Sequence, residues 1–104
     1  MSQKKKTTAK VVSQKEIAPQ IFDLWLETEL AQDARPGQFV ALYPKSEATL
    51  LPRPISICEA DKENNRLRLV YRIAGKGTKE FSAWRAGEEA ALLGVLGNGF
   101  PLDK

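Results

Sequence analysis

The stretch RLRLVYRI, residues 66–73, alternates apolar and polar side chains with a period of two. Its more apolar face carries Leu67, Leu69, Tyr71 and Ile73. The opposite face carries arginines together with Val70. Because successive side chains of a strand point to opposite faces, this pattern predicts a β-strand with one face in a core.

The same alternation recurs along the chain. In IFDLWLET, residues 21–28, one face carries Phe22, Leu24 and Leu26, and the other carries Asp23, Trp25 and Glu27. Further strands are predicted at residues 8–17, 38–44, 54–60 and 88–97.

Turn sequences separate these strands. The segment RPGQ, residues 35–38, has Pro-Gly at its centre, which suits a type II turn. Residues 61–66 form a polar hairpin loop, and residues 44–52 form a longer loop. Six short strands at regular spacing predict a mainly β fold: a six-stranded antiparallel barrel, closed or nearly closed.

One short helix is expected after the strand at residues 66–73. Thr78 can serve as its N-cap, and Gly87 can end the segment. Phe81 and Trp84 are three residues apart and share a face. A helix of about two turns persists only when it packs, so this face should lie against the sheet.

Composition excludes several kinds of chemistry. The 104 residues suffice for one domain, and the net charge of +3 equals the contribution of the lysines at positions 4–6. There is no histidine, which excludes Ser–His and Cys–His catalysis and histidine metal sites. The single cysteine, Cys58, cannot form an internal disulfide or hold an iron–sulfur cluster, and it fits a reducing cytoplasm. Any chemistry must therefore come from a bound cofactor or a partner.

Other classes of protein are also not expected. No apolar run approaches the length of a membrane span, and the basic N-terminus has no apolar segment behind it, as a signal peptide would. No basic patch is interleaved with aromatic residues, so nucleic-acid binding is not predicted.

The first candidate binding segment is RPIS, residues 53–56. Pro52 and Pro54 bias the preceding residues toward extended backbone, which would present Arg53 at a strand end. A guanidinium there can bind a phosphate or pyrophosphate through two hydrogen bonds. The hydroxyl of Ser56 could meet a polar edge of a planar ligand. The motif alone is more typical of a surface arginine and a serine tolerated in a strand than of a binding site.

The second candidate segment is YRIAGKGT, residues 71–78. Gly75 and Gly77 allow close backbone approach, and the free N–H groups at a helix start can bind phosphate. The spacing is not that of a P-loop. The alternative is an ordinary glycine-rich turn.

The third segment is LGVLGNGF, residues 93–100. Its glycines read G-x-x-G-x-G, the reverse of the dinucleotide fingerprint, and no βαβ unit follows within the chain. A Rossmann site is therefore not predicted, and the simplest interpretation is a flexible exit from the last strand.

The order of the three segments is more informative than each one alone. RPISI, YRIAGKGT and LGVLGNGF together resemble the flavin-binding barrel of the ferredoxin–NADP reductase superfamily. Within it they resemble the electron-transfer subunit of type B dihydroorotate dehydrogenase, an oxidoreductase of pyrimidine biosynthesis. The resemblance covers essentially the whole chain. RPIS is common to the superfamily, whereas LGxLGNGF is more particular to this branch.

The resemblance implies that the barrel, of the Greek-key type, binds FAD. Arg53 would hold the FAD pyrophosphate. Pro54, Ile55 and Ser56 would line the isoalloxazine ring, with Ser56 near its N5 edge.

The resemblance also implies a second wall. Val70, Tyr71 and Arg72 would form it, with Tyr71 against the flavin and Arg72 helping to balance phosphate charge. Gly77 and Thr78 would donate backbone and hydroxyl hydrogen bonds to the pyrophosphate. No catalytic residue and no metal ligand are predicted in the chain itself.

The expected domain plan follows from the same resemblance. Residues 1–7 are a flexible basic tail, residues 8–100 are the FAD-binding domain, and residues 101–104 begin a link to an absent region. In the family that region binds NAD and a [2Fe–2S] cluster, and the subunit joins a catalytic dihydroorotate dehydrogenase subunit in a heterotetramer. Electrons would pass between NAD(H), flavin and cluster, so the chain alone would not complete the transfer. Val95 stands where the family often has proline.

Two other interpretations stay open. The chain could be the FAD-binding domain of another reductase of the same superfamily. It could also be a non-enzymatic barrel that binds a protein or an oligonucleotide, although such a barrel would not need RPIS and AGKGT in this order.

Overall fold

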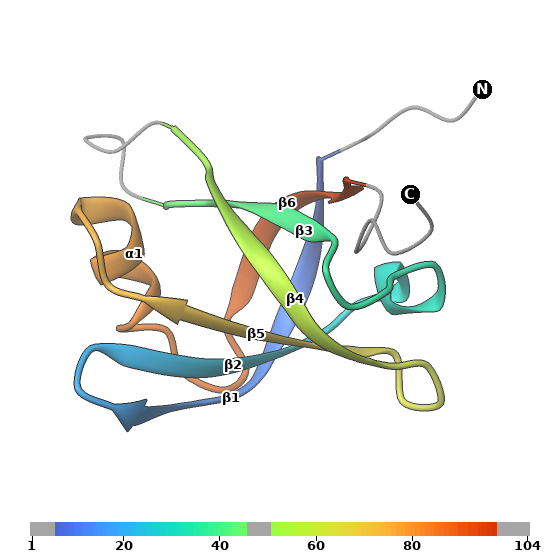
Figure 1. Ribbon diagram of the computed structural model, residues 1–104, viewed down its shortest axis with the longest axis horizontal. Coiled ribbons are helices and arrows are strands. Elements are labelled where there is room, and N and C mark those ends of the chain that lie inside the picture. The colour runs from blue at the N-terminus through green and yellow to red at the C-terminus, as the bar shows by residue number, and fades with distance from the viewer. Residues whose placement is uncertain (1–5, 46–50, 98–104) are drawn as a thin grey trace.

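The computed structural model describes residues 6–45 and 51–97, and these residues form a closed antiparallel barrel (Figure 1). Around the barrel the strands follow the order β1-β2-β5-β4-β3-β6. The described elements are β1 (Lys6–Ala18), β2 (Ile21–Glu27), a 3-10 helix η1 (Glu29–Gln32), β3 (Phe39–Tyr43), β4 (Arg53–Asp61), β5 (Arg66–Arg72), α1 (Lys76–Phe81) and β6 (Glu89–Leu96). The predicted fold class is confirmed.

The strand order is that of a Greek key. Strands β3, β4 and β5 are joined in sequence and lie side by side, and β2 returns to pair with β5. The predicted strands all form, with ends that differ from the predicted ones by at most two residues.

The core is built from the alternating faces that the sequence indicates. Leu67, Leu69 and Tyr71 of β5 are buried, as are Leu24 and Leu26 of β2. The interior is completed mainly by aliphatic side chains from the other strands, among them Val11, Val40, Leu42, Ile55, Ile57 and Leu92.

Strand β1 closes the barrel. Its first half pairs with β6, from Lys6 opposite Leu93 to Lys10 opposite Glu89, and its second half pairs with β2. The strand begins at Lys6, so part of the predicted tail belongs to the sheet, and residues 1–5 lie outside the described residues.

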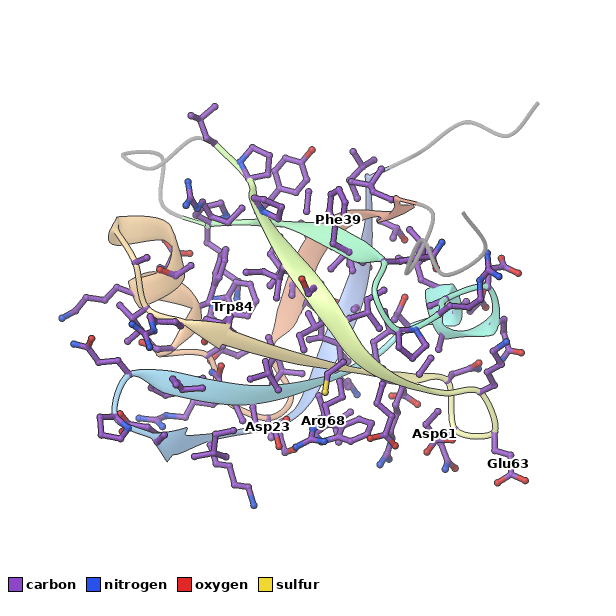
Figure 2. The ribbon with its side chains drawn as sticks, viewed as in Figure 1. Asp23, Phe39, Asp61, Glu63, Arg68 and Trp84 are labelled. Carbon is purple, nitrogen blue, oxygen red and sulfur yellow. The ribbon has the colours of Figure 1, made fainter. Side chains whose placement is uncertain are left out.

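An ion pair ties strands together on the outer surface. Asp23 of β2 is only 6% exposed, and its carboxylate accepts hydrogen bonds from Arg68 Nε at 2.9 Å and Arg68 Nη2 at 3.2 Å (Figure 2). The hydrogen bond with Asp23 raises the pKa of Arg68. Glu59 of β4 lies 3.7 Å from the same guanidinium, so three neighbouring strands share one charged group.

The helix begins earlier than predicted. It spans Lys76–Phe81, with Gly75 at the N-cap position at φ 93°, so the expectation that Thr78 is the N-cap was wrong. Glycine takes the positive φ without strain. The Thr78 hydroxyl instead accepts a hydrogen bond from Ala74 N–H at 2.6 Å and donates to the Gly75 carbonyl at 3.3 Å.

The end of the helix also differs from the prediction. The helix stops at Phe81, and Gly87 lies in a later turn at φ 94°, where Glu88 N–H donates to the Arg85 carbonyl at 3.1 Å. Trp84 therefore lies beyond the helix, so the expectation that it shares a helix face with Phe81 was wrong, whereas the expected burial of both side chains is confirmed. Phe81 and Trp84 are both buried, their ring centroids are 4.8 Å apart, and Trp84 lies beside α1 (Figure 2).

A tight turn and a 3-10 helix lie between β2 and β3. The type II turn at residues 35–38 is confirmed, since Gly37 has φ 95° and Gln38 N–H donates to the Arg35 carbonyl at 3.1 Å. The 3-10 helix η1 was not predicted; Thr28 caps it by accepting a hydrogen bond from Leu30 N–H at 3.2 Å.

None of the helices in the described ranges is long and apolar enough to cross a membrane.

Gly94 of β6 provides a test of the barrel packing. A Cβ at this position would lie 2.8 Å from Val40 Cγ1, closer than packed carbon atoms approach. We expect Gly94→Ala to lower the free energy of unfolding by about 1–3 kcal/mol in urea titrations, through overpacking. Because Val40→Ala removes the clashing methyl, the double variant should lose less than the sum of the two single losses. Strict additivity would contradict this close approach.

Candidate functional site

A cleft of about 240 Å³ opens at the end of the barrel beside α1. Its described lining includes eight of the predicted site residues, and it adds Ala74, which the sequence did not single out. The lining residues are Arg53, Pro54, Ile55, Ser56, Val70, Tyr71, Arg72, Ala74 and Thr78. Gly77 is the second residue of α1, next to Thr78.

The cleft exists because β4 and β5 part. They pair from Asp61 opposite Arg66 as far as Ile57 opposite Leu69. Beyond that point residues 53–56 of β4 pair with β3, and residues 70–72 of β5 pair with β2. Figure 1 shows the two strands separating toward α1.

Two arginines stand on the opposite walls of this cleft. Arg53 begins β4, Arg72 ends β5, and both side chains are exposed. Within the described residues, neither guanidinium has a hydrogen bond or an ion pair to another side chain. None of the described residues that line the cleft is a carboxylate. The described part of the site therefore presents positive charge to an anion.

The β4 wall combines a buried and an exposed residue. Ile55 is 5% exposed and belongs to the core, whereas Pro54 and Ser56 are exposed. Ser56 is therefore exposed at the cleft.

Tyr71 forms the inner part of the β5 wall. Its side chain is 5% exposed, its ring stacks on Phe22 with centroids 5.8 Å apart, and Phe81 meets it edge-on at 6.2 Å. Its hydroxyl donates a hydrogen bond to the side-chain oxygen of Gln14. Burial raises the pKa of Tyr71, so its phenol stays neutral in the ordinary pH range.

Thr78 supports the floor of the cleft. Its side chain is 4% exposed, and its hydroxyl bonds to the backbone of Ala74 and Gly75. This arrangement fixes the loop between β5 and α1. The hydroxyl proton already has an acceptor, so donation to a ligand would require the hydroxyl to rotate.

A second, larger hollow of about 550 Å³ lies at the opposite end of β5, beside η1 and the β4–β5 hairpin. Its lining comprises Thr7, Thr8, Glu27, Thr28, Glu29, Leu30 and Asn65. Among the described residues, its lining has two carboxylates and neither lysine nor arginine, a charge that disfavours phosphate groups. The smaller cleft is therefore the better candidate for an anionic ligand.

The described part of the chain contains no cluster of three or more Cys, Asp or Glu side chains that could hold a metal ion.

Curated relatives match the chain over most of its length. It is 50% identical over 95 residues to the dihydroorotate dehydrogenase B (NAD(+)) electron transfer subunit of Lysinibacillus sphaericus, which covers 90% of this chain and 37% of that relative. With the same subunit of Enterococcus faecalis it is 46% identical over 101 residues, or 96% of this chain and 38% of the relative. The chain thus spans less than two-fifths of the length of these relatives.

Solved structures share the fold. An NADH-dependent reduced ferredoxin–NADP oxidoreductase matches with a TM-score of 0.79 and 30% identity, over 88% of this chain and 33% of that chain. A ferredoxin NADP+ reductase from Neisseria gonorrhoeae, with bound FAD and NADP, matches with a TM-score of 0.70 and 18% identity, over 91% of this chain and 39% of that chain.

No protein-family model matches the chain. The curated relatives nevertheless agree with one another in name, and they confirm the resemblance carried by RPISI, YRIAGKGT and LGVLGNGF. The chain belongs to the family of dihydroorotate dehydrogenase B electron transfer subunits, in the ferredoxin–NADP reductase-like superfamily.

Proposed function

We propose that the cleft between β4 and β5 binds FAD and that the barrel is the flavin-binding part of an electron transfer subunit. The observation that carries this proposal is a pair of guanidinium groups, Arg53 and Arg72, on opposite walls of one cleft and without a side-chain partner in residues 6–45 and 51–97. A pyrophosphate is the anion that such a pair suits best, since charge-assisted hydrogen bonds to phosphate oxygens are strong and directional.

The remaining lining suits the rest of the cofactor. Ser56 offers a hydroxyl to a polar edge of the isoalloxazine ring, near N5, while Pro54, Val70 and Tyr71 offer apolar contact area. Ile55 shapes this wall from the core. Ligand pockets are commonly about 300–1,000 Å³, so a cleft of about 240 Å³ would hold part of FAD and leave the rest over the surface.

The phosphate side of the cleft would use the start of α1. Gly77 and Thr78 stand in the first turn, where backbone N–H groups have no intrahelical acceptor. They would add hydrogen bonds to a pyrophosphate that the arginines hold.

FAD supplies the exchange between two-electron transfer with NAD(H) and single-electron transfer. The chain's own residues would bind the cofactor, orient its ring and balance its charge. Transfer to a [2Fe–2S] cluster, and then to a catalytic dihydroorotate dehydrogenase subunit in a heterotetramer, would need other parts of the subunit. The name of the curated relatives supports NAD and dihydroorotate as the reactants. Oxidation of dihydroorotate for pyrimidine biosynthesis in the cytoplasm is the role that we propose.

A related reductase is the second candidate. The match of 30% identity to an NADH-dependent ferredoxin–NADP oxidoreductase supports it. That candidate would use the same flavin cleft and differ in the final electron acceptor.

Arg53 provides a direct test of FAD binding. Titration of FAD into the purified chain should give a saturable change in the visible flavin spectrum. Arg53→Ala should weaken binding by about 1.5–3 kcal/mol, because a charge-assisted hydrogen bond is lost. The matched control is Arg35→Ala, an exposed arginine in the turn at residues 35–38, outside the cleft lining. Unchanged affinity in Arg53→Ala would sink the pyrophosphate assignment.

A second prediction separates the two ends of the ligand. Riboflavin has the isoalloxazine ring but no phosphate, so Arg53→Ala and Arg72→Ala should leave its affinity unchanged while weakening that of FAD. Competition binding, measured by quenching of flavin fluorescence, makes the comparison. Equal losses for riboflavin and FAD would place the arginines at the ring instead.

A further inference from the structure

Gln14 of β1 connects the cleft to α1. Its side chain is half-buried, and its Nε2 donates to the carbonyl oxygens of Phe81 at 2.9 Å and Trp84 at 3.1 Å. Its Oε1 accepts the hydrogen bond from the Tyr71 hydroxyl. One amide therefore joins three segments that are far apart in the sequence.

The direction of the Tyr71 bond follows from the other two. Backbone carbonyls only accept, so the amide N–H₂ group of Gln14 must face Phe81 and Trp84. Its oxygen is then the group that meets Tyr71. An amide oxygen has no proton to give, and the phenol must be the donor. The single hydroxyl proton of Tyr71 is thereby turned away from any ligand.

Two aromatic rings, those of Phe22 and Phe81, also pack against the ring of Tyr71. Phe22 stacks on one face with an interplanar angle of 18°, and Phe81 meets the ring at 81°. Phe81 therefore contacts Tyr71 through its ring and Gln14 through its carbonyl. A shift of Gln14 would move both the phenol and the end of α1.

We propose that Gln14 is a positioning residue for the flavin: it holds Tyr71 so that the ring, and not the hydroxyl proton, is offered to the cofactor. This inference rests on the proposed function, since Tyr71 lines the cleft assigned to FAD. Gln14 itself is not among the residues that line that cleft. It acts on the ligand through Tyr71.

The chemical consequence concerns hydrogen bonding to the ring. A free phenol in the cleft would donate to a nitrogen or oxygen of the isoalloxazine and shift its absorption bands. With the proton committed to Gln14, Tyr71 contributes contact area alone. Loss of Gln14 frees that proton, so the spectrum of bound flavin should change together with the affinity.

The experiment compares Gln14→Met with Gln38→Met in the full 104-residue chain. Gln38 is a matched control because its side chain also bonds to the backbone, donating to the Gly97 carbonyl at 3.1 Å and accepting from Arg35 N–H at 2.8 Å. We expect Gln14→Met to weaken FAD binding about five- to tenfold, the size of one net hydrogen bond, and to shift the visible difference spectrum. Gln38→Met should change neither, even where it lowers the melting temperature equally.

Tyr71→Phe completes a double-variant cycle. It removes the phenol proton and keeps the ring, and should weaken FAD binding through the lost bond to Gln14. If Gln14 acts through Tyr71, adding Gln14→Met should cause no further loss of affinity. Additive losses would overturn the proposal, because Gln14 would then act through α1. Should Gln14→Met fail to fold, Gln14→Leu and Gln14→Ala take its place in the cycle.

The outcomes separate this inference from the proposed function. If the wild-type chain gives no flavin spectrum with FAD, the proposed function fails and this inference fails with it. If the wild type binds FAD and Gln14→Met binds it with the same affinity and spectrum, only the inference fails.

Discussion

Strands β4 and β5 are hydrogen-bonded from their shared hairpin as far as Ile57 and Leu69, and then they part. In a closed barrel every strand needs a partner on each side, or its backbone N–H and C=O groups lose their acceptors and donors. Here each strand keeps one partner: the start of β4 stays with β3, and the end of β5 stays with β2. The gap between them is the cleft, and its walls carry Arg53 and Arg72. The position of the site is therefore a consequence of how the barrel closes.

Three arginines of the barrel fall into two groups, one paired within the protein and the other exposed at the cleft. Inside the barrel wall, Arg68 is paired with Asp23 and lies near Glu59, so its charge is balanced within the protein. Arg53 and Arg72 are exposed and unpaired among the described residues, so water solvates them until a ligand replaces it. The same type of side chain joins neighbouring strands in one place and, in the function that we propose, contacts a ligand in another. The neighbouring residues determine which of these two roles an arginine has.

Much of the fold could be predicted from the sequence because strand alternation is a local pattern. RLRLVYRI gives the buried face of β5, and Pro-Gly gives the turn at residues 35–38. The start of α1 could not be predicted correctly, because Gly75 and Thr78 are both plausible caps and only the backbone dihedral distinguishes them. The 3-10 helix η1 is too short to show a periodic pattern.

The candidate site was predictable to a similar extent. The segment RPIS and residues 70–72 at the end of β5 could be named in advance. Both line the cleft that opens where β4 and β5 separate. Gln14 could not be named, since its role depends on contacts with residues 57, 67 and 70 positions away in the sequence. A glutamine within an alternating strand has no local feature that indicates such contacts.

The two-sided pairing of β1 has a kinetic consequence. The first half of β1 pairs with β6, which lies at almost the other end of the described chain. Its second half pairs with β2, which follows after a two-residue turn. Bringing distant segments together costs chain entropy before their contacts can form, and folding slows accordingly. During synthesis the β1–β2 hairpin can form early, while the seam between β1 and β6 closes only after the last strand has left the ribosome. The cleft between β4 and β5, although made of β4, β5 and α1, would become rigid only when that seam closes.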